Sequence, residues 1–189
     1  MGKTVLIIGG ARSGKSHYAQ ELARSKSGRV LFVATAEAGD EEMRQRIEEH
    51  KKARPATWRT LEVQGHIGNR IRQEIGEAQV VIVDCIALLV NNVLSQHQGA
   101  GNGQIDQKEA EKAVVDEINA LLECCQQVEA SFIIVSNEVG LGIVPADKTS
   151  RLYRDLLGKA NQMLARQADE VLMMAAGIPL RLKGNDSSP

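Results

Sequence analysis

Two hydrophobic patterns alternate along this chain. Short continuous apolar runs rich in β-branched residues predict buried strands, and apolar residues spaced three or four positions apart predict helices. The predicted strands cover residues 4–8, 29–35, 58–63, 79–84, 131–136, 170–175 and 180–183. The predicted helices cover residues 17–23, 40–53, 67–77, 86–94, 106–127 and 151–168. This alternation predicts an α/β fold with a mostly parallel sheet, helices on both faces and a C-terminal β-hairpin.

The segment between the first strand and the first helix fits the P-loop pattern, in which Gly and four residues precede Gly-Lys-Ser. It consists of Gly9, Gly10, Ala11, Arg12, Ser13, Gly14, Lys15 and Ser16. Glycines let backbone N–H groups approach a phosphate chain, and the helix N-terminus adds further donors. We expect Lys15 to reach the β- and γ-phosphates and Ser16 to bind Mg²⁺. The alternative, a glycine-rich turn that binds nothing, is disfavoured by the strand–loop–helix order.

Polar residues follow other predicted strands, at the sheet edge where ligands of such folds bind. Asp84 ends a buried strand downstream of the P-loop, which is the Walker B position, so we expect it to hold Mg²⁺ directly or through water. It could instead, or in addition, cap the next helix. Thr35 and Glu62 are placed to contact a ligand, although a capping or solvated role is the commoner one for each. The glycine-spaced segment 137–145 either lines a site or forms a tight turn.

His50 lies in a predicted helix that is otherwise dominated by charged residues. It follows Met43 and Ile47 at spacings of seven and three, so all three fall on one face, the face expected to point inward. Lys51 and Lys52 stand beside it and could screen phosphate charge. The histidine is therefore either a nucleophile facing a triphosphate or an ordinary half-buried helix residue. Spacing alone favours the second reading.

Composition narrows the class of protein. The chain has 189 residues, which suits a single nucleotide-binding domain over residues 1–183, with a disordered tail at 184–189. A net charge of −1 and 3% aromatic residues disfavour nucleic-acid binding. Three cysteines do not form a disulfide framework, and no apolar run has membrane-spanning length. We therefore expect a cytoplasmic protein with no nucleic-acid partner and no membrane span.

Several motifs together resemble the bifunctional adenosylcobinamide kinase / adenosylcobinamide-phosphate guanylyltransferase family of cobalamin biosynthesis, from Thr4 to about Lys183. Four segments carry the resemblance. They are residues 9–16; Ala34-Thr35-Ala36 with residues 40–43, 46–47, His50-Lys51, Arg54-Pro55 and Trp58-Arg59-Thr60; Asp84-Cys85 with Asn92; and residues 137–145 with 153–155 and 158–162. A P-loop alone is shared by many families, whereas the second and fourth segments are far more specific.

The resemblance implies a RecA-like P-loop fold, a homotrimer and two reactions. A nucleoside triphosphate, ATP or GTP, phosphorylates adenosylcobinamide; GTP then transfers GMP to adenosylcobinamide phosphate, giving adenosylcobinamide-GDP. The second reaction of the family passes through a GMP-histidine, and His50 is the matching position. The family's nucleotide contacts fall on the P-loop and on Ala34, Thr35, Ala36, Lys51, Lys52, Ala53, Arg54, Glu62 and Asp84.

Two other functions fit part of the sequence. A small-molecule P-loop kinase without nucleotidyl transfer would use the same loop and leave His50 structural. A non-catalytic GTP-binding regulator would be expected to carry an Asn-Lys-x-Asp motif for guanine, but Asn137 is followed by Glu138-Val139-Gly140. The bifunctional kinase and guanylyltransferase is therefore the preferred hypothesis.

Overall fold

The computed structural model describes residues 2–26, 28–36, 41–52, 54–97 and 105–184. Within the second helix, the side chains at 42, 43, 46, 47, 49 and 50 are outside this description. The predicted contacts of Ala53 and of the His50 imidazole thus fall outside the described part of the chain. So does most of the tail, so its expected disorder stays a prediction.

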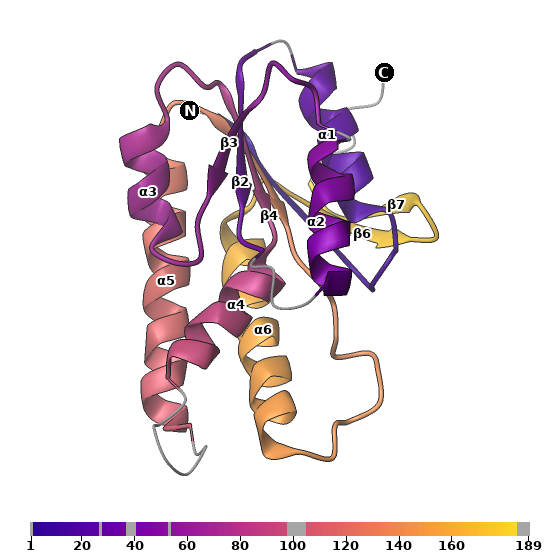
Figure 1. Ribbon diagram of the computed structural model, residues 1–189, viewed down its shortest axis with the longest axis vertical. Coiled ribbons are helices and arrows are strands. Elements are labelled where there is room, and N and C mark those ends of the chain that lie inside the picture. The colour runs from indigo at the N-terminus through magenta and orange to yellow at the C-terminus, as the bar shows by residue number, and fades with distance from the viewer. Residues whose placement is uncertain (1, 27, 37–40, 53, 98–104, 185–189) are drawn as a thin grey trace.

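One sheet runs through the molecule (Figure 1). In the described residues it has seven strands in the order β3-β2-β4-β5-β1-β6-β7. The strands are β1 (Thr4–Gly9), β2 (Val30–Ala34), β3 (Arg59–Glu62), β4 (Val80–Asp84), β5 (Ser131–Val135), β6 (Glu170–Ala175) and β7 (Ile178–Lys183). Neighbours from β3 to β6 pair in parallel, and β7 pairs antiparallel to β6. The predicted parallel sheet and C-terminal hairpin are confirmed.

Helices cover both faces of the sheet, also as predicted. They are α1 (Lys15–Ser25), α2 (Glu41–Lys52), α3 (Ile67–Glu74), α4 (Ile86–Gln96), α5 (Gln107–Gln127) and α6 (Lys148–Gln167). Figure 1 shows α1 and α2 on one side of the sheet and α3 and α5 side by side on the other. This division follows from right-handed crossovers, because the chain moves one way along the sheet from β1 to β3 and the other way from β3 to β6.

Among the element boundaries that differ from the prediction, three have a clear local reason. Helix α6 begins three residues earlier, because the Asp147 carboxylate accepts a hydrogen bond from the Ser150 N–H at 2.7 Å and caps the first turn. Helix α3 ends three residues earlier, just before Gly76, whose φ of 51° breaks the helix. Strand β7 begins two residues earlier at Ile178, and its Pro179 is tolerated because the strand is at the sheet edge.

The core lies on both faces of the central strands. Strands β2, β4 and β5 are almost fully buried, and Phe32 and Phe132 are the largest of their enclosed side chains. The edge strand β7 differs, because all of its residues are exposed. Burying the central strands fixes their carboxyl ends in one rigid edge, and this edge carries the predicted site residues.

Candidate nucleotide-binding site

The P-loop joins β1 to α1 and closes around its own lysine. Lys15 is buried, and its Nζ donates to the Gly10 carbonyl oxygen at 2.5 Å and to Ser13 Oγ at 3.4 Å. Arg12 and Gly14 have φ values of 55° and 92°, which turn the backbone sharply before the helix. The ammonium group is thus held inside a ring of backbone that also ends at a helix N-terminus. This is an anion-binding arrangement.

The turn between β6 and β7 supports this loop from behind. The Gly177 N–H donates to the Ser13 carbonyl oxygen at 3.1 Å. A Cβ atom on Gly9 would lie 2.5 Å from the Met174 carbonyl oxygen, and one on Gly14 would lie 3.2 Å from the Gly177 Cα. Packing against the C-terminal hairpin therefore requires glycine at position 9, and at position 14 the close contact adds to the positive φ that already favours glycine. The sequence pattern identified the glycines but not this second reason.

Strand register brings three predicted site residues into one row. Ala34 at the end of β2 pairs with Glu62 on β3 and with Asp84 on β4. The next strand, β5, lies between β4 and the P-loop strand β1. The row therefore leads from Glu62 across the sheet edge toward the P-loop, so residues from distant parts of the sequence share one surface.

Asp84 lies one residue before the N-cap position of α4, which is Cys85. The Cys85 side chain makes no capping hydrogen bond. Asp84 itself is half-buried, and both its Walker B role and a capping role stay predictions.

Thr35 is placed differently from a ligand-facing residue. Its side chain is fully buried, and its Oγ1 donates to the Cys85 carbonyl oxygen at 2.7 Å while accepting from the Cys85 N–H at 2.8 Å. The hydroxyl is thus used inside the protein. Its neighbour Ala36 is half-buried at the same edge, and whether either contacts nucleotide stays a prediction.

Arg54 follows α2 and lies on the face of a core aromatic ring. Its guanidinium carbon is 3.7 Å from the centroid of Phe32 in β2. Burial lowers the pKa of Arg54, and the charges of Asp84 and Glu62 act in the opposite direction. Its buried Nε and Nη1 atoms have no hydrogen-bond partner among the described residues. A buried guanidinium with unused donors suits an anionic ligand. The arginine was predicted, but nothing in the sequence indicated that Phe32 supports it.

Lys51 connects the end of α2 to β3. Its Nζ lies 2.7 Å from Glu62 Oε1 and 3.7 Å from Glu48 Oε1. The hydrogen bond to Glu62 raises the pKa of Lys51, so the side chain is a cation at neutral pH. Lys52 is exposed beside it. Two predicted contacts, Lys51 and Glu62, are thereby brought together.

The oxygen groups at this edge fit a magnesium ion. Ser16 lies in the first turn of α1, and Asp84 ends the strand second from β1. No group of three or more His, Cys, Asp or Glu side chains with metal-binding geometry occurs in the part of the chain that the structure describes. Mg²⁺ commonly takes one or two protein oxygens and completes its shell with substrate phosphates and water. A hydroxyl and a carboxylate are therefore a suitable protein contribution.

The cysteines take no part in this chemistry as thiolates. All three are free, and burial raises the pKa of Cys85 to about 12 and that of Cys124 to about 11. At neutral pH both are protonated and unreactive.

A strand, a closed P-loop and a helix, with an aspartate two strands away, define a P-loop nucleotide-binding protein. Residues 5–182 match the model of the CobU family, described as cobinamide kinase / cobinamide phosphate guanyltransferase. The chain belongs to this family, which confirms the resemblance noted from its motifs.

Relatives cover almost the whole chain. The bifunctional adenosylcobalamin biosynthesis protein CobU of Escherichia coli (strain K12) is 39% identical, over 95% of this chain and 99% of its own length. The protein of the same name from Salmonella typhimurium (strain LT2) is 40% identical over the same shares. These matches confirm the predicted enzyme class and the assignment to cobalamin biosynthesis.

Solved structures show the fold at low sequence identity. An ATPase from the type III secretion system of pathogenic bacteria superposes with a TM-score of 0.55 at 12% identity, covering 92% of this chain and 51% of that one. The RadB recombinase superposes with a TM-score of 0.50 at 12% identity, covering 90% and 73%. Both support the P-loop fold alone. No helix in the described ranges is long and apolar enough to cross a membrane.

Proposed function

We propose that this chain phosphorylates adenosylcobinamide with ATP or GTP and then transfers GMP from GTP to adenosylcobinamide phosphate through a GMP-histidine at His50. The observation that carries the proposal is the P-loop closed on Lys15, in a chain that matches its family almost from end to end. The product is adenosylcobinamide-GDP.

The kinase step takes place at the P-loop. The hydroxyl oxygen of the corrinoid's aminopropanol arm attacks the γ-phosphorus, the bond to the β,γ-bridging oxygen breaks, and the hydroxyl proton is released. Lys15 and the loop N–H groups stabilise the charge on the phosphate oxygens as this occurs. Ser16 and Asp84 would hold Mg²⁺, which neutralises phosphate charge and orients the triphosphate when it is bound.

The second reaction proceeds in two displacements. An imidazole nitrogen of His50 attacks the α-phosphorus of GTP and pyrophosphate leaves, so that a phosphoramidate forms. A phosphate oxygen of adenosylcobinamide phosphate then attacks the same phosphorus, and the imidazole is released as the leaving group. Dividing the transfer in this way replaces one difficult step by two easier ones. The helix position of His50, next to cationic Lys51 and close in sequence to Arg54, supports this role.

We assign the nucleotide contacts to the same edge of the sheet. The P-loop residues would bind the phosphates, together with Ala34, Thr35, Ala36, Lys51, Lys52, Ala53, Arg54, Glu62 and Asp84. The Nε and Nη1 atoms of Arg54, which have no hydrogen-bond partner among the described residues, support binding of an anionic group of the nucleotide beside the guanidinium that lies over Phe32. The row formed by Glu62, Ala34 and Asp84 supports a single continuous site.

We also propose that the protein is a cytoplasmic homotrimer. In the part of the chain that the structure describes, large apolar side chains are exposed in two places, which supports burial against further copies of the chain. They are Leu141, Ile143 and Val144 in the loop after β5, and Ile178, Leu180 and Leu182 on β7. Light scattering on a sizing column would give three times the chain mass of 20.5 kDa, and a monomer would refute the assembly. Three free thiols support a reducing compartment.

Self-labelling tests the histidine intermediate. Purified protein is incubated with Mg²⁺ and GTP labelled at the α-phosphate, beside His50→Ala and the control Gln45→Ala, which changes an exposed residue of the same helix. We expect an acid-labile, base-stable label on wild type and Gln45→Ala but not on His50→Ala. If wild type binds GTP but takes up no label, nucleotidyl transfer is refuted. The better hypothesis is then a small-molecule P-loop kinase without nucleotidyl transfer. Label retained by His50→Ala would refute only the choice of residue.

A further inference from the structure

The side chain of Asn92 connects two strand ends that lie far apart in the sequence. Asn92 is half-buried in the second turn of α4. Its Nδ2 donates to the Thr35 carbonyl oxygen at 2.9 Å and to the Gln64 carbonyl oxygen at 3.2 Å. Thr35 directly follows β2, and Gln64 lies two residues beyond β3. One amide group therefore holds the exits of both strands.

The exit of β2 is also joined to the end of β4. Besides the two hydrogen bonds between the Thr35 hydroxyl and Cys85, the Thr35 N–H donates to the Asp84 carbonyl oxygen at 3.2 Å. The fully buried Thr35 thus has its hydroxyl, its N–H and its carbonyl all engaged. Together with Asn92 these bonds form a continuous polar network at the carboxyl edge of three adjacent strands.

This network holds the segment that carries the proposed nucleophile. Helix α2, with His50, lies between β2 and β3 in the chain, so its two anchors are the exit of β2 and the strand to which the chain returns. Asn92 bonds to the exit of β2, where this segment begins, and to Gln64, which lies past the carboxyl end of β3. The same strand ends carry Ala34 and Glu62, which pair with each other in the sheet. Shifting the exit of β2, or β3 as a whole, would move α2 relative to the row of site residues.

We propose that Asn92 is a positioning residue for GMP transfer, acting through the carboxyl ends of β2 and β3, the two strands between which the His50 helix lies. This inference rests on the proposed function. None of the hydrogen bonds of Asn92 reaches the P-loop, which is held instead by β1, α1 and the β6–β7 turn. Loss of the amide should therefore impair the histidine step far more than phosphoryl transfer. Geometry errors of about 1 Å suffice for such an effect, because they can cost on the order of 100-fold in rate.

Two substitutions separate positioning from simple stability. Asn92→Asp preserves shape but replaces the N–H donors by a carboxylate oxygen, which would face two carbonyl oxygens. Asn92→Ala removes the group, and Asn92→Gln keeps the donors on a longer side chain. Asn91→Ala is the matched control, because Asn91 is exposed on the same helix.

Each variant is measured in two assays and corrected for its folded fraction by circular dichroism. One assay follows the rate of enzyme labelling from α-labelled GTP, and the other follows phosphoryl transfer from γ-labelled nucleotide to cobinamide. For Asn92→Asp and Asn92→Ala we expect labelling to fall at least about 10-fold, with kinase activity within about threefold of wild type. Asn92→Gln should be intermediate in labelling, and Asn91→Ala should match wild type in both assays.

The outcomes separate this inference from the function on which it rests. Wild type that takes no label refutes GMP-histidine formation, and the role of Asn92 with it. If wild type is labelled and Asn92→Asp is labelled at the same rate, only the positioning role of Asn92 is refuted. An equal loss of both activities would also refute it, because that result means a general effect on folding or on nucleotide binding.

Discussion

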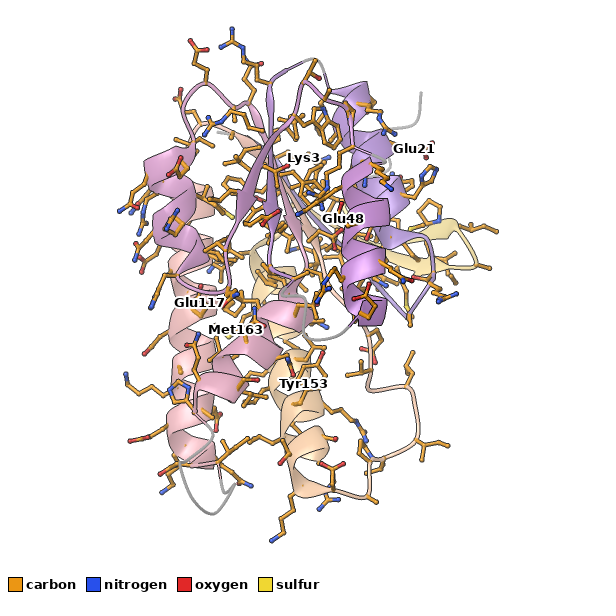
Figure 2. The ribbon with its side chains drawn as sticks, viewed as in Figure 1. Lys3, Glu21, Glu48, Glu117, Tyr153 and Met163 are labelled. Atoms are coloured by element: carbon orange, nitrogen blue, oxygen red, sulfur yellow. The ribbon has the colours of Figure 1, made fainter. Side chains whose placement is uncertain are left out.

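Replacing Glu117 by alanine should destabilise the protein although this residue is far from the nucleotide site in sequence and in role. Glu117 is buried on α5, where the helix passes the start of α3 (Figure 2). Its Oε1 accepts a hydrogen bond from the Ile67 N–H at 2.7 Å, and its Oε2 accepts one from the His66 N–H at 2.9 Å. The carboxylate thus caps α3 from a different helix, in place of a local capping side chain, which His66 does not provide.

The size of the effect follows from the two bonds. A hydrogen bond to a charged group contributes about 1.5–3 kcal/mol, and a buried donor left without a partner costs about 1–3 kcal/mol. The Ile67 N–H is buried and would lose its partner fully, whereas the more open His66 N–H can bind water. We therefore expect Glu117→Ala to lower the free energy of unfolding by about 3 kcal/mol. Glu117→Gln keeps one acceptor oxygen and should lose less.

Urea unfolding followed by circular dichroism measures this difference. Glu123→Ala is the control, because Glu123 is exposed on the same helix, and it should change stability by less than about 0.5 kcal/mol. A Glu117→Ala variant as stable as Glu123→Ala would show that water replaces the carboxylate without cost. The capping argument for α3 would then be wrong.

Further predictions concern the nucleotide site and the buried cysteines. Gly9→Ala should lower the melting temperature and abolish GTP binding in calorimetry, because its Cβ would lie 2.5 Å from a carbonyl oxygen; Gly10→Ala, with nothing within 4 Å, should keep the wild-type melting temperature. Arg54→Lys should raise the KM for GTP about 10-fold with little change in stability, since lysine lacks the planar donors that lie over the ring; an unchanged KM would exclude a contact with the nucleotide. The raised pKa values of Cys85 (about 12) and Cys124 (about 11) keep both protonated at pH 8, so mass spectrometry should find them unalkylated by iodoacetamide until urea is added. Because the unfolded thiols ionise above about pH 8.5 while the folded ones keep their protons, stability should also fall as pH rises beyond that value.

The sequence alone predicted the elements and the chemistry that depend on neighbouring residues. Continuous apolar runs such as the one ending at Asp84 predicted buried strands, and the glycine and lysine spacing predicted the phosphate loop. Two of the boundaries that were missed depend on single residues. The start of α6 could have been placed from Asp147, a capping residue three positions before Ser150. The end of α3 could have been placed from Gly76.

Relations between distant segments were decided only by the tertiary structure. The row formed by Glu62, Ala34 and Asp84 depends on strand order and register, which no local pattern encodes. The same holds for the Arg54 guanidinium over Phe32 and for the amide of Asn92 between two strand exits. Periodicity and motifs depend on residues that are close together in the chain, so they predict helices, strands and local loops. The partners of a buried or hydrogen-bonding side chain depend on how the whole sheet packs, because these contacts join segments that are distant in the sequence.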